Sequence, residues 1–478
     1  MTVFRSGYSK GHDPVSGSAV PGTAETPVYI RSLDVENVRC FGEQQTLSFT
    51  DGQNNPVQWT LILGDNGVGK TTLLQCLAWM RPVRQDAEGS LIEPALSGEE
   101  NSTLNSLVRV GDNQVSVNLK AVFSVGQSLG SGNRGVVSSN DTVTTGYRIT
   151  GQVGNIEETT PRGHGPMSRA VPADIPVFGY GAARCTGIRR LDKGGLSDPL
   201  TSHFDDLAEF YDAEDVLLKL DYRATKSETG RKSTGGRDQE RLQKIKEILI
   251  SVLPDVDSPE AIHILGPEVI GHPDEPSGVR FQTPYGVVPL SALSLGYQTT
   301  LTWVLDLALR LYERYPDCSK PLSEPAIVLI DNIDLHLHPR WQRRLMDDLS
   351  TCFPAVQFVA STHSPLIVQA AEDANLVVLQ QREGEVLITP HSGSVDEWRA
   401  DQILSSDLFD VPTRSRSVEK LMKKRDDLLD EMCRSPEQEA ALRSLENQLE
   451  ELPTAVDPAD QEAMDLIRCA AENLRNNG

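Results

Sequence analysis

Apolar and polar positions along the chain follow two rhythms, and each rhythm predicts one kind of element. Between Val28 and Phe49 apolar residues alternate with polar ones, which is typical of one or two half-buried strands. Residues 61–63 form an apolar run that breaks into the glycine-rich stretch 64–69, and apolar periodicity resumes from Leu73. This order predicts a strand, a loop and a helix.

Strand patterns continue in the next part of the chain. From residue 81 to residue 174, strand-like pieces such as 114–123 are separated by loops rich in Gly, Ser and Asn, which predicts a peripheral antiparallel sheet. Residues 175–184 predict a buried strand that ends in a glycine turn carrying Arg184. Two interpretations of this arginine stay open: a structural turn, or contact with phosphate or a partner subunit.

Residues 202–252 have a mainly helical pattern, which a polar stretch interrupts near 229–236. Positive residues gather here, in contrast to the acidic chain as a whole: Arg223, Lys226, Arg231, Lys232, Arg237, Arg241, Lys244 and Lys246. A solvated helical face is the usual explanation of such a run. Contact with nucleic acid or with an acidic partner is the alternative.

Further elements are predicted in the second half of the chain. A strongly periodic stretch predicts a helix from Thr299 to Tyr312, and Pro339 opens an amphipathic helix. The apolar, β-rich runs 326–330 and 356–360 predict buried strands of a parallel sheet.

The C-terminal part carries apolar residues at helical spacing amid heavy charge, which predicts an amphipathic or coiled-coil pair of helices. These residues are Val418, Leu421, Leu428, Met432, Leu442, Leu445, Leu449 and Leu452. Packing back onto the rest of the chain is the commoner role of such helices. Binding a partner protein or driving oligomerisation is the alternative.

Composition narrows the class of protein. A chain of 478 residues has room for about two to four domains. Its net charge of −23 argues against a basic coat for nucleic acid, although a local basic patch is compatible with it. The seven cysteines are scattered and form no C-x-x-C pair, which indicates reduced thiols. Because neither a membrane span nor a signal-peptide core is recognisable, we expect a cytoplasmic protein without a membrane partner.

The glycine-rich stretch has the chemistry of a phosphate-binding loop. Gly64, Gly69, Lys70 and Thr71 fit the spacing G-x-x-x-x-G-K-[ST]. Glycines let main-chain N–H groups close around phosphates at the start of a helix. Lys70 can reach the β- and γ-phosphates, and Thr71 can offer its hydroxyl to Mg²⁺. A chance match is disfavoured by the flanking strand and helix patterns. The predicted nucleotide-binding residues here are Gly64, Asp65, Asn66, Gly67, Gly69, Lys70, Thr71 and Thr72.

A second group of polar residues lies in the C-terminal half. Small residues and Ser294 precede a helix, an arrangement that offers N–H groups and a hydroxyl to an anion. Asp331 ends a buried strand, where its carboxylate can bind Mg²⁺. His336 and His338 invite a zinc site, but they are two positions apart in a turn and need not share a ligand geometry.

The order and spacing of these pieces resemble the ABC-type ATPases of the SMC and RecF-like group. Residues 64–71 match its Walker A motif, 293–298 its signature, 327–331 its Walker B motif and His363 its switch histidine. The string from Asp331 to Pro339 is similar to that of short prokaryotic members, many of which serve in anti-phage defence, among them the ATPase subunit of Septu. The resemblance covers residues 28 to 415.

This resemblance implies a nucleotide sandwich between two copies of the chain, with ATP and Mg²⁺ as cofactors. One copy supplies Lys70, Thr71 and the Mg²⁺ ligand Asp331, together with His363. The other copy supplies its signature residues, Ser294, Gly296 and Gln298. ATP would join the two copies, and hydrolysis would release them.

One position departs from the family. The residue after the Walker B aspartate, a glutamate in the family, is Asn332 here, and an amide cannot accept a proton as a carboxylate does. ATP binding should survive, but hydrolysis should be slow. Either Asp334 or His363 partly replaces the glutamate, or the bound nucleotide is a long-lived switch. Asn332, His363 and Asp334 are therefore the candidate catalytic residues.

We therefore predict an α/β fold: an ABC-type P-loop ATPase head with a peripheral antiparallel sheet, a short helical insertion and a C-terminal helical extension. The predicted parts follow in order. They are a disordered tail (1–26), an N-terminal ATPase lobe (27–200), a helical insertion (201–255), a C-terminal ATPase lobe (256–395) and a helical extension (396–478).

The leading functional hypothesis is a nucleotide-gated dimer or larger assembly that acts as the regulatory subunit of an anti-phage defence complex. Because the C-terminal helical extension carries no nuclease motif, we expect a separate nuclease subunit as a partner. The alternative is a RecF-like DNA-repair ATPase that binds DNA directly, which the basic residues between 223 and 246 favour and the acidic balance disfavours. A scaffold that binds ATP only to assemble is a third possibility.

Overall fold

The computed structural model describes residues 26–84, 92–94, 107–109, 114–127, 129, 141–152, 155–164, 175–184, 198–208, 210–229, 235–253, 256, 258–265, 278–391, 393, 395, 398–409, 416–430 and 435–450. Almost all of the predicted tail, 1–26, lies outside these residues. The chain divides into two compact units, Met1–Ile403 and Leu404–Gly478. The first unit holds all four sheets of the described residues and every candidate site residue.

A peripheral sheet forms one layer of the first unit. Its five strands run in the order β2-β1-β6-β7-β8, and every neighbouring pair is antiparallel. Their bounds are Val28–Glu36 (β1), Gln45–Ser48 (β2), Gln114–Val125 (β6), Asp141–Gln152 (β7) and Asn155–His164 (β8). A small pair, Pro82–Arg84 (β4) and Ile92–Pro94 (β5), follows helix α1 in the chain. The predicted peripheral antiparallel sheet is confirmed.

The central sheet has six strands in the order β16-β15-β3-β14-β13-β9. All neighbours are parallel except the edge pair β15 and β16. The bounds are Trp59–Gly64 (β3), Val177–Tyr180 (β9), Ala326–Ile330 (β13), Val356–Ser361 (β14), Asn375–Arg382 (β15) and Glu385–His391 (β16). Strands β9, β13 and β14 are buried along their whole length, as continuous apolar runs predict for a covered parallel sheet.

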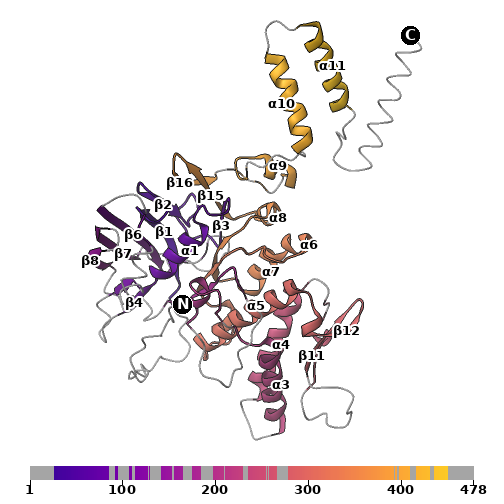
Figure 1. Cartoon of the computed structure of the whole chain (residues 1–478). Coiled ribbons are helices and arrows are strands. Elements are labelled where there is room, and N and C mark those ends of the chain that lie inside the picture. Colours follow the sequence, from indigo (N-terminus) through magenta and orange to yellow (C-terminus); the bar gives the residue numbers. More distant parts are fainter. Residues whose placement is uncertain are drawn as a thin grey trace. The chain divides into compact units, whose positions relative to one another are not determined.

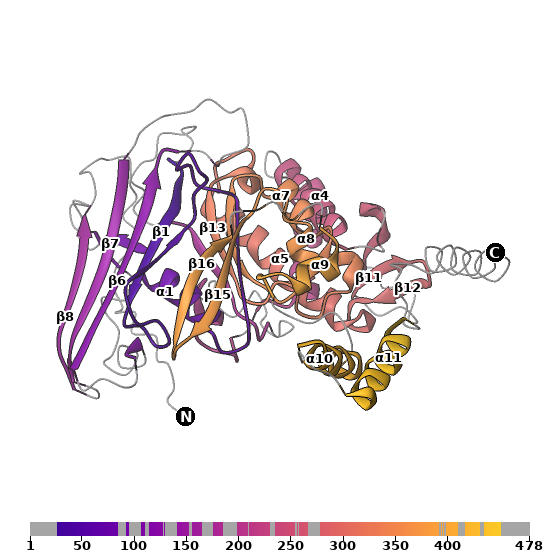
Figure 2. The same ribbon diagram turned by 90° about the horizontal axis from the view of Figure 1, so that it is seen from above.

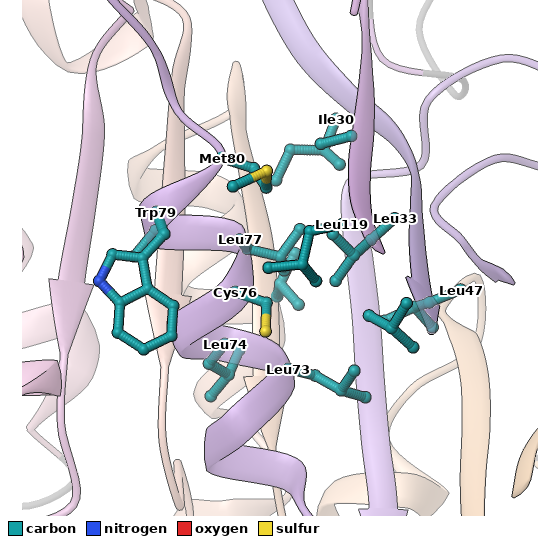
Figure 3. Packing of buried hydrophobic residues seen from close by; sticks show 14 of the residues in the cluster. Ile30, Leu33, Leu47, Leu73, Leu74, Cys76, Leu77, Trp79, Met80 and Leu119 are labelled. Carbon is teal, nitrogen blue, oxygen red and sulfur yellow. The ribbon is translucent and has the colours of Figure 1, made fainter. Parts of the chain in front are cut away.

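Helix α1 (Lys70–Trp79) fills the space between the two sheets, as Figure 2 shows from above. Eight of its ten residues are buried, because one face meets each sheet. In Figure 3, Leu73 and Leu77 of α1 lie opposite Leu33 of β1 and Leu119 of β6. Residues of β3, β13, β14 and β15 belong to the same buried cluster, so α1 joins the two sheets into one core.

Helices cover the other face of the central sheet (Figures 1 and 2). They are α5 (Leu295–Arg314), α6 (Pro339–Gln342), α7 (Leu345–Cys352) and α8 (Pro365–Gln369). The helical insertion consists of α3 (Ala213–Thr229) and α4 (Gly235–Val252), which contact each other. A three-stranded sheet follows it, formed by Ile262–Leu265 (β10), Gly278–Thr283 (β11) and Gly286–Pro289 (β12).

The second unit contains a pair of contacting helices, α10 (Arg416–Asp430) and α11 (Pro436–Glu450). These are the two helices that the C-terminal pattern predicts. Helix α9 (Ala400–Ser405) spans the boundary between the units. Within the part of the chain that the structure describes, no helix is both long and apolar enough to cross a membrane.

The α/β fold is confirmed, and three helix limits differ from the prediction. Helix α5 begins at Leu295 rather than Thr299, because its first turn is partly exposed and carries no apolar periodicity. The insertion becomes α-helical only at Ala213, where the Asp212 carboxylate accepts the main-chain N–H of Glu214. The helix expected from Pro339 is two short ones, α6 and α7. The division of the chain into five parts stays a prediction.

Candidate nucleotide-binding site

The strand order of the central sheet brings the candidate motifs to one edge. Strands β3, β14, β13 and β9 are consecutive neighbours and parallel, so the turns after them meet along their carboxyl ends. The phosphate loop follows β3, His363 follows β14, Asp331 follows β13 and Arg184 follows β9. One site therefore combines residues from Gly64 to His363, which are 363 − 64 = 299 positions apart in the chain.

The phosphate loop requires its glycines. Gly64, Gly67 and Gly69 have positive φ angles of 140°, 85° and 98°, which side chains with a Cβ rarely adopt. A Cβ on Gly64 would also lie 2.6 Å from the carbonyl oxygen of Leu379. Gly69 is the residue before the first turn of α1, so the main-chain N–H groups of that turn face the loop.

Side chains of the loop differ in exposure. Asp65 and Asn66 are exposed, whereas Lys70 and Thr72 are buried. The Lys70 ammonium donates to the main-chain carbonyls of Gly64 and Asp65, at 2.8 Å each. Burial lowers the pKa of Lys70, although the Asp331 and Asp65 carboxylates act in the opposite direction. The main-chain carbonyl groups of the loop therefore enclose the Lys70 ammonium group.

Thr71 and Asp331 meet directly. The Thr71 hydroxyl donates to one Asp331 carboxylate oxygen at 2.6 Å, and the Ser361 hydroxyl donates to the other at 2.5 Å. Asp331 is 3% exposed, and it is held by one hydroxyl from helix α1 and one from the neighbouring strand β14. A hydroxyl and a carboxylate are the hard oxygen ligands that Mg²⁺ takes when phosphate oxygens and waters supply the rest. The donor set therefore fits Mg²⁺.

The turn after Asp331 carries the candidate catalytic residues. Asn332 has a φ of 49°, in the left-handed region. One carboxylate oxygen of Asp334 accepts the Thr362 hydroxyl at 2.6 Å and the His363 N–H at 3.2 Å. Asp334 thus holds the turn that carries His363. Burial lowers the pKa of the half-buried His363, and the positive charge of Lys70 lowers it further.

The signature residues do not join this cluster. Ser294 is exposed and precedes α5, and Gly296 packs so closely on the turn after β13 that a Cβ there would lie 2.2 Å from the carbonyl oxygen of His336. The Gln298 amide donates to the carbonyls of Leu293 at 2.7 Å and Ser291 at 3.3 Å. Within the described residues, no hydrogen bond links Ser294 or Gln298 to the phosphate loop.

The two histidines near Asp331, His336 and His338, differ in their surroundings. His338 precedes α6 and its Nδ1 accepts the Arg340 N–H at 3.3 Å, whereas His336 is exposed with a φ of 63°. Over the described ranges, no three or more His, Cys, Asp or Glu side chains gather as a metal-binding group.

Two residues at this edge, Arg39 and His203, are not indicated by the sequence. The Arg39 guanidinium donates to the Thr72 hydroxyl at 3.1 Å and to the Gln75 side chain at 2.9 Å. His203 is buried, and its Nε2 lies 3.1 Å from the carbonyl of Leu329 in β13. Burial lowers the pKa of His203 to about 4, so its ring is neutral in the folded protein at neutral pH.

Arg184, by contrast, is singled out by the sequence, and the structure bears on its two interpretations. Its guanidinium is 8% exposed, and Nη2 donates to the main-chain carbonyl of Asn332 at 2.5 Å. Burial lowers the pKa of Arg184 to about 10, opposed by the carboxylates of Asp331 and Asp334, so the side chain stays positive at neutral pH. The arginine therefore turns inward to the site rather than outward from its turn. No sequence signal points to Arg39 or His203, since both act through contacts made by folding.

Several of the basic residues in the insertion are engaged within the fold. The Arg241 guanidinium lies 4.6 Å from the centre of the Tyr312 ring, and the Lys246 ammonium donates to the carbonyl of Ile262 at 3.1 Å. Lys244 pairs with Glu247 at 2.8 Å. Arg223 and Arg237 are exposed, and Arg231 and Lys232 lie outside the described residues. These contacts favour the structural interpretation of the basic run.

Known families and proteins resemble this chain. Residues 196–369 match the family described as "AAA domain, putative AbiEii toxin, Type IV TA system", and residues 32–81 match one described as "AAA domain". Septu protein PtuA of Bacillus mycoides (strain KBAB4) is 22% identical over 427 residues, which cover 88% of this chain and 50% of that protein. The predicted resemblance to the Septu ATPase subunit is confirmed.

Other relatives match shorter stretches. The Retron Vc95 probable ATPase of Vibrio cholerae is 34% identical over 139 residues, or 29% of this chain and 27% of that protein. The chain thus spans half or less of the length of these two relatives. Among solved structures, the SMC head domain from Thermotoga maritima aligns over 76% of this chain and 99% of its own, with 15% identity and a TM-score of 0.37.

Proposed function

We propose that this PtuA-like chain is an ATP-binding ATPase of the anti-phage defence type, which works as a nucleotide-gated dimer or larger assembly. The observation that carries the proposal is the 2.6 Å contact between the Thr71 hydroxyl and the Asp331 carboxylate. Thr71 lies in the first turn of α1, after the glycine-rich loop that follows β3, and Asp331 follows β13, which is separated from β3 by β14 in the same parallel sheet. This arrangement suits a Mg²⁺ ion bound to nucleotide phosphates.

A second copy of the chain is the natural source of the missing part of the site. Ser294 and Gly296 lie at the start of α5. Ser294 is exposed, and Gly296 packs on the turn after β13. Within the described residues, neither forms a hydrogen bond to the phosphate loop of its own chain. In a head-to-tail pair, each copy would offer these residues to the nucleotide on the other. ATP would then act as a bridge whose removal separates the copies.

Hydrolysis in this assembly is slow. Asn332 offers no carboxylate to the attacking water, and Asp334 already accepts two hydrogen bonds that hold the turn of His363. The state of the bound nucleotide would then persist long enough to act as a signal. The names of the relatives, a Septu protein and a retron ATPase, support a role in anti-phage defence. We further propose that the protein is cytoplasmic and that this chain controls a separate nuclease subunit.

Nucleotide affinity tests the proposal. Titration with a fluorescent ATP analogue in the presence of Mg²⁺ should give saturable binding to the parent protein. Lys70→Ala should weaken that binding by about tenfold or more, because it removes the charge that meets the phosphates. Lys120→Ala, an exposed lysine of the peripheral sheet, is the matched control and should bind like the parent. Equal affinity of all three proteins would overturn the assignment of the site.

A further inference from the structure

Arg184 is a charged group at the site to which the proposed function gives no role. It follows β9, the fourth strand of the parallel run, and is buried although its guanidinium remains positive. Nη2 donates to the carbonyl of Asn332, whereas Nη1 is buried without a hydrogen-bond partner within the described residues. An arginine in such a position is costly unless its charge or its geometry is used.

The main chain around Asn332 is held on both sides. The Asn332 N–H donates to the Ser361 hydroxyl at 2.8 Å, and the Asn332 carbonyl accepts Arg184 Nη2 at 2.5 Å. The residues on either side are fixed as well, because the Asp331 N–H donates to the Tyr180 carbonyl and the Ile333 N–H to the Ser361 carbonyl, at 2.8 and 2.9 Å. Both polar groups of the 332 peptide therefore have defined partners.

The conformation that these contacts hold is an uncommon one. Asn332 has a φ of 49°, and asparagine and aspartate enter this region several-fold more readily than other residues with a Cβ. In this conformation the Asn332 side chain lies close to Ser361, the partner of the proposed Mg²⁺ ligand Asp331. The Asn332 amide oxygen is 3.5 Å from the Ser361 hydroxyl, which itself donates to Asp331.

We propose that Arg184 is a positioning residue of the nucleotide site: together with Ser361 it holds residue 332 in the left-handed conformation that places the 332 side chain beside the Ser361 hydroxyl, the group that donates to Asp331. The inference rests on the proposed function, since it concerns how that site holds the residue whose missing carboxylate makes the proposed hydrolysis slow. Its consequence is sharpest when position 332 carries glutamate, which enters the left-handed region less readily than asparagine and depends more on being held.

Turnover in the Asn332→Glu background tests the inference. Adding Arg184→Met, which keeps much of the side-chain volume, should lower kcat about ten- to hundredfold while KM for ATP changes less than about threefold. Adding Arg184→Lys, which keeps the charge and N–H donors, should restore part of the loss. Arg241→Ala, a half-buried arginine of the insertion, is the matched control and should leave kcat unchanged.

Two kinetic results would overturn the inference. One is an unchanged kcat in the Arg184→Met protein. The other is a loss of kcat that tracks the thermal midpoint of unfolding and that Arg184→Lys shares fully, which would make Arg184 a purely structural residue. If Arg184→Met fails to fold, the comparison of Arg184→Lys with Asn332→Glu alone decides, with an intermediate kcat expected at unchanged KM.

Crystal structures of the double variants at positions 184 and 332 distinguish a failure of this inference from a failure of the proposed function. If Asn332→Glu binds ATP but shows no gain in turnover, the account of slow hydrolysis fails, while the role of Arg184 is still decided by geometry. When Arg184→Met is combined with Asn332→Glu, residue 332 should leave the positive-φ region, whereas Arg184→Lys in the same background should keep it there. A φ that stays near its present 49° in the Arg184→Met double variant would overturn the positioning role.

Discussion

Asn332 combines a chemical and a conformational property at one position. Its amide cannot accept a proton from water, and its φ of 49° is one that asparagine tolerates well. The sequence alone indicates only the first property, because the backbone angle depends on the partners Ser361 and Arg184. A substitution at this position therefore changes both the chemistry and the ease of holding the turn.

Asn332→Glu should raise ATP turnover. A positioned carboxylate contributes about 10²- to 10⁴-fold in general base catalysis, and backbone strain at this turn will offset part of that gain. We expect an increase of about tenfold or more in kcat, measured by phosphate release. Asn332→Asp, whose carboxylate is one methylene shorter, should gain less, and adding Lys70→Ala should abolish turnover. Turnover in the parent equal to that of the glutamate variant would contradict this role of Asn332.

His203 gives the fold a pH dependence. Its pKa is lowered to about 4 by burial, against an ordinary value of 6.5, so the unfolded chain binds more protons between these two pH values. Stability attributable to this histidine is therefore fully present above pH 6.5 and is lost as pH falls toward 4. At pH 5 the loss amounts to about 2 kcal/mol.

Chemical unfolding at about pH 7.5 and about pH 5 checks this prediction. His203→Gln keeps an N–H donor for the Leu329 carbonyl without a titrating ring, so its drop in unfolding free energy should be smaller than that of the parent by about 2 kcal/mol. Equal drops in the two proteins would show that His203 does not titrate as its burial implies.

Motif spacing predicts local chemistry better than long-range contacts. Gly64, Lys70 and Thr71 lie in one short stretch whose residue types imply phosphate binding, so the sequence alone indicates them. The contact between Gln75 and the carbonyl of His203 joins residues 128 positions apart. Such a pair carries no signal in a single sequence. The catalytic roles assigned to Asp334 and His363 stay predictions.

At the scale of elements, the strands were predictable but their order was not. Apolar runs indicated buried parallel strands at 326–330 and 356–360. That β14 lies between β3 and β13 depends on how the chain crosses over between them, which periodicity does not encode. This order decides which turns become neighbours, and it puts Ser361 within reach of Asp331.

The close approach of α5 to the turn after β13 makes a further prediction. Gly296→Ala would put a Cβ 2.2 Å from the carbonyl oxygen of His336, so helix or turn must move. Although alanine favours helix, we expect a net loss of about 1–3 kcal/mol in unfolding free energy, together with loss of ATP-dependent assembly. Gly52→Ala is the control, since nothing lies within 4 Å of its added Cβ. A Gly296→Ala protein as stable as that control would contradict the packing argument.

At the scale of the whole molecule, charge alone does not indicate which kind of partner the protein binds. The net charge of −23 and the basic run in the insertion point to different partners. Packing reduces the conflict, because Arg241 and Lys246 are engaged with Tyr312 and the Ile262 carbonyl. The helices α10 and α11 were expected from their apolar spacing, while their role, packing or partner binding, stays open to experiment.

The central claim is that nucleotide joins copies of this chain, and molar mass in solution tests it most directly. Light scattering of the purified protein should show a mass that at least about doubles when Mg-ATP is added, as closure of a symmetric dimer requires. Lys70→Ala should keep its nucleotide-free mass under both conditions. A parent protein that binds Mg-ATP with no change of mass would contradict the account.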